Sequence, residues 1–239
     1  RTLVEQLSQA NAAKNQLLGM AAHDLRNPLA SIRALAGLLQ EDGAGPLNAD
    51  QRDLIATIQE ASQSMLTLVN ELLDTSVLES GEVAIAPVEA SLAELLEKEI
   101  RLQNLNAAGK GQRIVLAPGD ALPARLRFDP DKVRQVINNL LSNACKFSPP
   151  GSVITVRKAV APGTCTVAVQ DQGPGIPENE RHKLFQDFGR TSVRPTSGEK
   201  STGLGLAICR RIMVAHGGTI GAEPCPEGGS IFRFTLPTS

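Results

Sequence analysis

The segment that decides the fold is residues 129–147, which read DPDKVRQVINNLLSNACKF. Asp129 is a favourable N-cap residue, and Pro130 suits the first helical position because its missing N–H would have no partner there. The apolar residues that follow predict a helix that runs to about Phe147. Short alternating stretches at 114–116, 124–128, 153–160, 164–170, 219–223 and 230–236 predict strands around this helix.

Further helices are expected on both sides of this segment. Ser91 and Glu94 form the pattern of a capping box, which predicts the start of a helix. A helix is also predicted from Glu178 to about Phe185, and another ends at His216, before two glycines. Helices and strands that alternate without a regular βαβ repeat predict an α+β sandwich.

Residues 1–80 have a different pattern and read as helix almost throughout. Residues 42–46, DGAGP, interrupt the pattern, and Asn48 with Gln51 predicts a new helix start. A single hairpin cannot surround its own apolar seam, so we expect two hairpins to pair as a homodimeric four-helix bundle. The first seam has the 3.5-residue repeat of a supercoil and consists of Leu18, Ala22, Leu25, Leu29, Ile32, Ala36 and Leu39. The second seam, on the second helix, consists of Leu54, Ile58, Ala61, Met65, Leu68 and Leu72.

Composition excludes several classes of protein. With 24 basic and 25 acidic residues, the net charge is −1, which does not fit a nucleic-acid binder. No apolar stretch approaches the length that spans a bilayer, so no membrane contact by this chain is expected. The four cysteines form no C-x-x-C pair and are interpreted as reduced cytoplasmic thiols. The first residue is Arg, so we expect a fragment of a longer protein whose upstream sensor region and any membrane anchor precede it.

His23 directly follows the seam residue Ala22, which places it on the exposed flank of the first helix. Asp24 could hold one ring nitrogen as N–H and leave the other nucleophilic. Asn27 lies one turn on, on the same face. From position alone, an ordinary solvated histidine is the more common case.

Three polar residues on the helix that ends near Phe147 indicate a magnesium-phosphate site. Asn139 and Asn143 are four residues apart and share a face, with Lys146 near the same side. Amide oxygens are hard ligands suited to Mg²⁺, and a lysine can meet phosphate charge. A polar helix face is the alternative, although asparagine is a poor residue within a helix.

Two glycine-rich segments complete the candidate site. Asp171 ends a strand and precedes Gly173 and Gly175, where the backbone can approach a ligand closely and the carboxylate could accept a hydrogen bond from an exocyclic amine. The second segment, residues 201–208, leads through glycines into a helix whose first N–H groups can bind phosphate. An Asp-Gly turn alone also occurs in ordinary loops.

In this order, the motifs resemble those of the two-component sensor histidine kinases. The resemblance covers nearly the whole chain after the first fifteen or so residues. The similar segments are the H box around His23, the N box at Asn139–Phe147, the G1 box at Asp171-x-Gly-x-Gly, the F box at Lys183–Phe188 and the G2 box at Thr202–Leu206.

The resemblance implies a domain plan and a fold. Residues 1–15 would be a coiled-coil linker helix, 16–80 the dimerisation and histidine-phosphotransfer domain, 81–87 a hinge, and 88–237 the catalytic ATP-binding domain. The last would have the α/β sandwich fold shared with type II topoisomerases, heat-shock chaperones and mismatch-repair ATPases. The implied activity is ATP-dependent phosphorylation of His23, then transfer to an Asp of a response regulator receiver domain, with phosphatase activity toward that regulator.

The resemblance also implies roles for single residues. His23 would be phosphorylated, Asp24 would orient it, and Asn27 would position water for dephosphorylation. Mg²⁺ would be held by Asn143 with help from Asn139. ATP would be bound by Asn139, Asn143, Lys146, Phe147, Asp171, Gly173, Gly175, Ile176, Thr202, Gly203, Leu204, Gly205 and Leu206, with 189–202 as a lid.

Two other functions stay open at this point. The chain could be a dimeric signalling module without catalysis, or an ATPase or protein-serine kinase of the same fold. ATP-hydrolysing relatives carry a Glu, the base for water, where this chain has Asn139. An amide has no useful basicity, which favours transfer to a side chain over hydrolysis.

Overall fold

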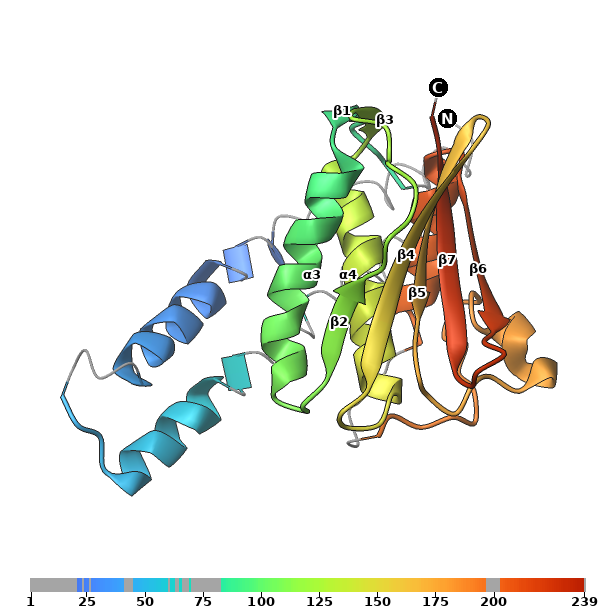
Figure 1. The fold of residues 1–239 in the computed structure, drawn as a ribbon. Helices are drawn as coiled ribbons and strands as arrows, with labels where there is room; N and C mark the ends of the chain where they lie inside the picture. The colour runs from blue at the N-terminus through green and yellow to red at the C-terminus, as the bar shows by residue number, and fades with distance from the viewer. Residues whose placement is uncertain are drawn as a thin grey trace, which may run out of the picture. The chain divides into compact units, whose positions relative to one another are not determined.

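The computed structural model describes residues 21–22, 24–25, 27–40, 45–59, 61–62, 65, 69, 83–196 and 203–238 (Figure 1). The chain divides into two compact units, Arg1–Gly81 and Glu82–Ser239. Each unit has its own core and is described by itself.

The first unit is helical, with continuous helix over the described residues 27–40 and 49–59. Among the described residues of its first helix, this unit buries one of the two apolar rows. Ala22, Leu29 and Ala36 are buried, seven residues apart, and two of them cluster with Val69 of the returning chain. The other row remains exposed, through Leu25, Ile32 and Leu39.

The predicted start of the second helix is confirmed. The Asn48 side-chain oxygen accepts a hydrogen bond from the Gln51 N–H at 2.8 Å, and the Gln51 side-chain oxygen accepts one from the Asn48 N–H at 2.9 Å. This reciprocal pair is the capping box that the sequence predicts.

The second unit is a two-layer sandwich of a five-stranded sheet and three helices, which cover one face of the sheet (Figure 1). The elements are β1 Val88–Ala90, α3 Leu92–Ala108, β2 Arg113–Leu116, β3 Leu126–Phe128, α4 Pro130–Phe147, β4 Val153–Ala161, β5 Thr164–Gln170, the 3-10 helix η1 Glu178–Lys183, α5 Gly205–Ala215, β6 Thr219–Pro224 and β7 Ser230–Pro237. The strand order is β2-β4-β5-β7-β6, with β2 parallel to β4 and the other three pairs antiparallel. A small second sheet pairs β1 with β3.

The core of this unit lies between the sheet and the helices and is almost entirely aliphatic. Alternate residues of β5 and β7 are buried, as the period of two predicts. The buried side chains of the two layers include Val136, Ile137, Leu140 and Leu141 of α4, Val167 and Val169 of β5, Phe232, Phe234 and Leu236 of β7, and Ile208, Ile212 and Met213 of α5.

Local signals placed the helix starts correctly. The Ser91 hydroxyl accepts from the Glu94 N–H at 3.2 Å, and Oδ1 of Asp129 accepts from the N–H groups of Asp131 and Lys132 at 3.0 and 3.1 Å. Helix α4 ends at Phe147, as predicted. The four cysteines, all within the described residues, form no disulfide.

Two local predictions were incomplete. The helix expected from Glu178 to about Phe185 is the six-residue 3-10 helix Glu178–Lys183, which has no side-chain cap and no buried residue. Without an apolar stripe to pack, this segment gains little from a longer α-helix. The short strand β1 was not predicted, since three residues carry too weak a pattern.

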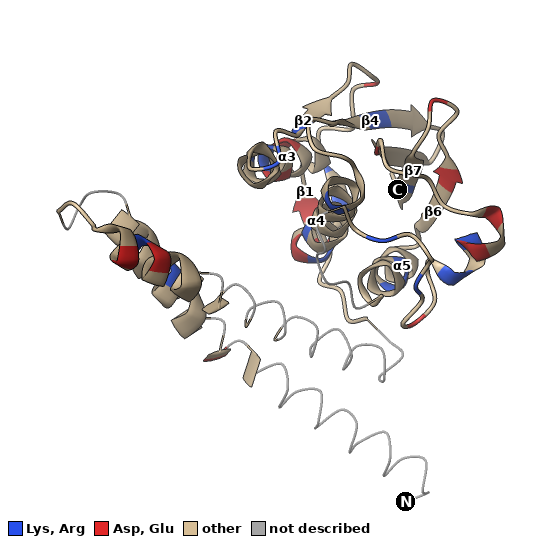
Figure 2. Ribbon diagram, turned by 90° about the horizontal axis from the view of Figure 1, so that it is seen from below, with Lys and Arg blue, Asp and Glu red and all other residues tan. Residues whose placement is uncertain are grey.

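Charge is mixed over the second unit. Figure 2 shows acidic and basic positions distributed over both the helices and the sheet. Among the described residues, no helix combines the length and apolar character needed to cross a bilayer.

Candidate nucleotide and phosphotransfer site

Asp171 is a buried carboxylate of the second unit that directly follows β5. Its side chain is 4% exposed, and its Oδ1 accepts hydrogen bonds from the N–H groups of Gly173 and Ser230 at 2.9 and 3.0 Å. Burial raises the pKa of the Asp171 carboxyl, and the two N–H donors only partly oppose that effect. Both bonds go to Oδ1, which leaves Oδ2 available for a ligand that donates a hydrogen bond.

The glycine loop after Asp171 packs tightly against the end of α4. A Cβ atom at Gly173 would lie 2.8 Å from the carbonyl oxygen of Phe147. Gly175 has φ of +77°, a conformation that other residues rarely adopt. These two glycines are therefore required by the turn itself, which brings the loop beside α4.

Two adjacent asparagines of α4 point in different directions. The Asn139 amide donates to the carbonyl oxygen of Gly205 at 3.2 Å, at the first residue of α5. A Cβ at Gly205 would lie 2.7 Å from Oδ1 of Asn139, so only glycine fits there without a shift. The Asn138 amide instead donates to Oε2 of the buried Glu99 on α3, at 2.9 Å. Asn139 thus ties α4 to the start of α5, while Asn138 belongs to the α3–α4 interface.

The carbonyl end of α4 is tied to Thr196, near the middle of the predicted lid segment. The Lys146 carbonyl oxygen accepts from both the N–H and the hydroxyl of Thr196, at 2.9 and 3.0 Å. The Thr196 hydroxyl also lies 3.1 Å from the Ser148 carbonyl oxygen, and the Ser148 hydroxyl accepts from the Gln172 N–H at 3.1 Å. Helix α4, the glycine loop and the lid segment therefore converge at one place.

The predicted F box packs against the start of α5. Phe188 has φ of +58° and is 63% exposed. Gly203 has φ of +78°, and a Cβ there would lie 2.9 Å from the carbonyl oxygen of Gly189. An ion pair of 2.9 Å between Asp187 and Arg211 joins the same two segments. This crowding explains glycine at 203, and a Cβ at Gly189 would in turn collide with the carbonyl oxygen of Lys183.

The structure brings several of the predicted nucleotide-site residues together. Asn139 of α4 contacts Gly205 of α5, and Phe147 of α4 lies beside Gly173 of the glycine loop. Asp24 and Asn27 lie exposed on the first unit. His23 and Thr202 lie outside the described residues. Sequence reasoning missed Ser230, whose N–H binds Asp171 from 59 residues away. The Gly-Gly-Ser sequence at the start of β7 is visible in the sequence, but nothing in it indicates that Ser230 contacts Asp171.

These residues fit a magnesium nucleotide. Oδ2 of Asp171, which accepts neither of the two N–H bonds, suits the amino group of a base. No cluster of three or more His, Cys, Asp or Glu side chains that could hold a metal occurs among the described residues. An amide oxygen such as that of Asn143 fits Mg²⁺, which takes few protein ligands and completes its shell with phosphate oxygens and water.

Both units match known families. Residues 13–81 match the His Kinase A (phospho-acceptor) domain. Residues 128–239 match the family described as histidine kinase-, DNA gyrase B-, and HSP90-like ATPase. The two matches occur in the same order as the two units of the chain.

Curated relatives are longer sensor proteins. The chain is 35% identical over 231 residues to the circadian input-output histidine kinase CikA of Synechococcus elongatus, which covers 95% of this chain and 30% of CikA. It is 36% identical over 231 residues to the sensor protein TorS of Escherichia coli, with coverage of 96% and 24%. The chain thus spans less than a third of the length of these relatives.

Solved structures agree with the sequence relatives. Full-length ShkA in complex with AMPPNP is 28% identical, with a TM-score of 0.68, over 94% of this chain and 46% of ShkA. The catalytic domain of the histidine kinase ThkA is 29% identical, with a TM-score of 0.56, over 64% of this chain and 96% of that domain. With a phospho-acceptor unit followed by an ATPase-type sandwich, and with histidine kinases as relatives in both sequence and structure, the chain belongs to the two-component sensor histidine kinase family.

Proposed function

We propose that this chain transfers the γ-phosphoryl group of ATP to His23, and from His23 to an aspartate of a response regulator receiver domain. The observation that carries the proposal is the buried Asp171, with one oxygen fixed by two backbone N–H groups and the other available, in the same chain as the phospho-acceptor helix. A solved ThkA complex holds the response regulator protein TrrA, which supports a partner of this kind.

In the nucleotide site, Asp171 would accept a hydrogen bond from the adenine amino group. Asn143 would ligate Mg²⁺ with help from Asn139, and Lys146 would contact phosphate. Bound Mg²⁺ would neutralise charge on the phosphates. The glycines of both loops, with Phe147, Ile176, Thr202, Leu204 and Leu206, would form the walls of the site. The ShkA complex with AMPPNP supports a nucleotide in this fold.

On the helical unit, His23 would be the phosphoryl acceptor and Asp24 would hold its ring in the productive tautomer. Asn27 would position water for removal of phosphate from the regulator. Since transfer needs little covalent help from the protein, alignment of His23 with the nucleotide is the main requirement. The hinge at 81–87 would permit that alignment between domains 16–80 and 88–237, with 1–15 as the linker from an upstream sensor domain.

Transfer is favoured over hydrolysis by the chemistry of position 139. An asparagine there donates through its amide to the Gly205 carbonyl oxygen, a bond that an ionised glutamate could not make. The same side chain lacks a basic group to activate water. Asn139 would therefore stabilise the nucleotide site without supplying a base for ATP hydrolysis.

A homodimeric four-helix bundle would bury the apolar row that the hairpin leaves exposed. Leu25, Ile32 and Leu39 are 50%, 41% and 41% exposed, and Ile58 and Met65 of the second helix are also exposed. Residues spaced by seven on both helices suit the seam of a bundle. A cytoplasmic location accompanies the proposal, because ATP is the phosphoryl donor.

Incubation with γ-labelled ATP and Mg²⁺ tests the function. Wild type should acquire a label that survives base and is lost in acid, and His23→Gln should acquire none. Label on His23→Gln would exclude His23 as the acceptor.

The phosphatase role is tested separately. Asn27→Ala should leave labelling intact and slow the release of phosphate from the phosphorylated regulator. Equal loss of both activities would contradict the separate role of Asn27.

A further inference from the structure

The turn that joins β6 and β7 meets the base-reading carboxylate directly. The Asp171 N–H donates to the Ser230 carbonyl oxygen at 2.9 Å, and the Ser230 N–H donates back to Oδ1 of Asp171 at 3.0 Å. The backbone of Ser230 therefore binds both the main-chain N–H and the side-chain Oδ1 of Asp171.

Gly229, the last residue of this turn, is pressed against Asp171. Its φ is +86°, and a Cβ there would collide with the Asp171 carbonyl oxygen and lie 2.9 Å from its Oδ1. Neither atom can give way easily, because the first is backbone and the second accepts two hydrogen bonds. Only glycine lets the turn approach closely enough for the Ser230 N–H to reach the carboxylate.

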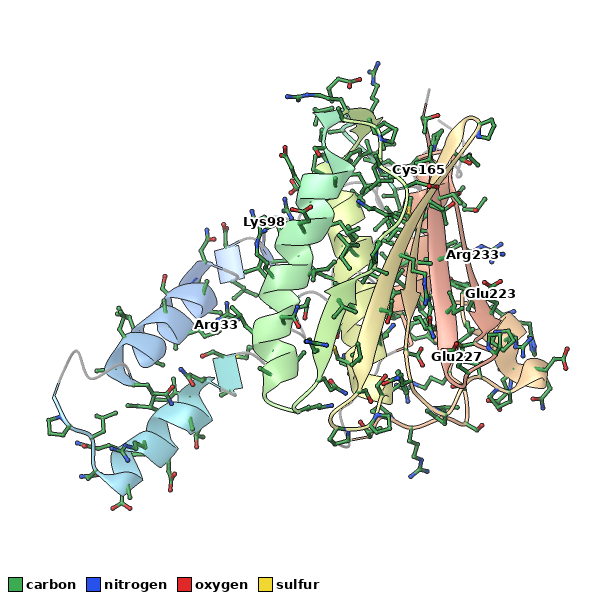
Figure 3. All side chains as sticks on the ribbon, in the orientation of Figure 1. Arg33, Lys98, Cys165, Glu223, Glu227 and Arg233 are labelled. Atoms are coloured by element: carbon green, nitrogen blue, oxygen red, sulfur yellow. The ribbon has the colours of Figure 1, made fainter. Side chains whose placement is uncertain are left out.

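The turn has its own internal supports. The Cys225 N–H donates to the Gly229 carbonyl oxygen at 3.1 Å, and the Gly228 N–H donates to the Cys225 carbonyl oxygen at 3.0 Å. The Gln170 amide, next to Asp171 in the chain, donates to the Cys225 sulfur at 3.0 Å. Next to the turn, an ion pair of 3.2 Å between Glu223 and Arg233 joins β6 to β7, and Figure 3 labels both residues.

We propose that the turn at 225–229 is a positioning device for Asp171, and that Gly229 is its critical residue. The device fixes Oδ1 so that Oδ2 faces the adenine amino group, and it thereby sets the preference for adenine over other bases. This inference rests on the proposed function of Asp171. It assigns a role in base recognition to a segment that lies outside the five sequence motifs, 54 to 58 residues after Asp171.

The same turn offers a matched control. Gly228 also has a left-handed backbone, with φ of +96°, but a Cβ there would meet nothing within 4 Å. Gly228→Ala and Gly229→Ala therefore carry similar backbone strain in one turn. They differ in that only Gly229→Ala collides with Asp171.

The experiment measures binding and autophosphorylation of the whole chain with ATP and with inosine triphosphate, which has a carbonyl oxygen in place of the adenine amino group. Gly229→Ala should weaken ATP binding roughly tenfold or more, because a charged hydrogen bond loses its geometry. Its KM for ATP should rise while kcat falls little, and its preference for ATP over inosine triphosphate should collapse. Gly228→Ala should retain the wild-type preference.

Circular dichroism establishes that each variant is folded. Should Gly229→Ala fail to fold, Cys225→Ala takes its place, since it removes the sulfur that accepts from Gln170. It should lower the same preference several-fold, and an unchanged preference would refute the role of the turn.

The outcomes separate this inference from the function on which it rests. If wild type binds both triphosphates equally, Asp171 does not read adenine and that part of the proposed function fails. If wild type prefers ATP and folded Gly229→Ala retains the full preference, only the role of the turn is overturned.

Discussion

Replacing Asp171 by Asn removes a buried charge and changes one of the two side-chain oxygens to an amide nitrogen, while the shape is nearly preserved. The retained oxygen can still accept from the Gly173 and Ser230 N–H groups. The new amide nitrogen can only donate, so it would face the donating amino group of adenine. The substitution should therefore raise the stability of the free protein and lower its affinity for ATP.

Free protein should become more stable at neutral pH. Burial raises the pKa of Asp171 above its ordinary value of 3.8, so the folded state binds more protons than the unfolded state between those two values. Stability consequently falls as pH rises through that interval. Asparagine removes this loss, although each of its two hydrogen bonds is weaker by about 1 kcal/mol than a bond to a carboxylate. Since burying an ion costs several kcal/mol, the expected gain is about 1 kcal/mol, or about 2–4 °C in Tm.

ATP binding should weaken by about 1–3 kcal/mol, or roughly 5- to 150-fold in Kd, because two donors meet in a buried site. The chain has no Trp and no Tyr, so calorimetry is preferable to intrinsic fluorescence. The transition that rises with added ADP identifies the nucleotide-binding unit, and the size of that rise reports affinity. The reasoning is refuted if the Asn variant is less stable than wild type without nucleotide, or if its transition rises with ADP as much as that of wild type.

Three further predictions concern other parts of the molecule. Gly205→Ala, whose Cβ would lie 2.7 Å from Oδ1 of Asn139, should weaken ATP binding in titration calorimetry, while Gly221→Ala, with nothing within 4 Å, should not. Asp129→Ala should cost about 1–2 kcal/mol in thermal unfolding by loss of its N-cap bonds. Burial is the largest single effect on the pKa of the Asp129 carboxyl and raises it, but backbone N–H bonds and Lys132 together lower the pKa below 3.8. The stabilisation by ionised Asp129 is therefore present at neutral pH and is lost as pH falls through the lowered pKa. Ile32→Lys should shift dimer to monomer in sedimentation, and an unchanged dimer would place the seam elsewhere.

Local sequence signals predicted much of the fold because their causes are local. Asp129 and Pro130 carry the start of α4 in adjacent residues, and β5 was predicted at Thr164–Gln170 from a period of two. The segment at 178–185 was predicted less well. Its charged residues supply helix propensity without an apolar face, and packing rather than propensity decides such cases.

The candidate site was predicted as a set of motifs, but its internal support was not. Nothing local distinguishes Asn138, which bonds Glu99 on α3, from Asn139, which bonds the start of α5. The hydrogen bond from Ser230 to Asp171 depends on the pairing of β5 with β7, and the register of that pairing follows from the whole fold. Contacts of this kind depend on tertiary structure and leave no periodicity in the sequence.

The most direct test of the account follows the phosphoryl group itself through a single turnover with ATP and Mg²⁺. Mass spectrometry under conditions that preserve phosphohistidine would locate the modified residue, and the inorganic phosphate released would be measured in parallel. The account predicts phosphate on His23 and little free phosphate during the first turnover. Stoichiometric release of inorganic phosphate with an unmodified His23 would contradict it and would make the chain an ATPase.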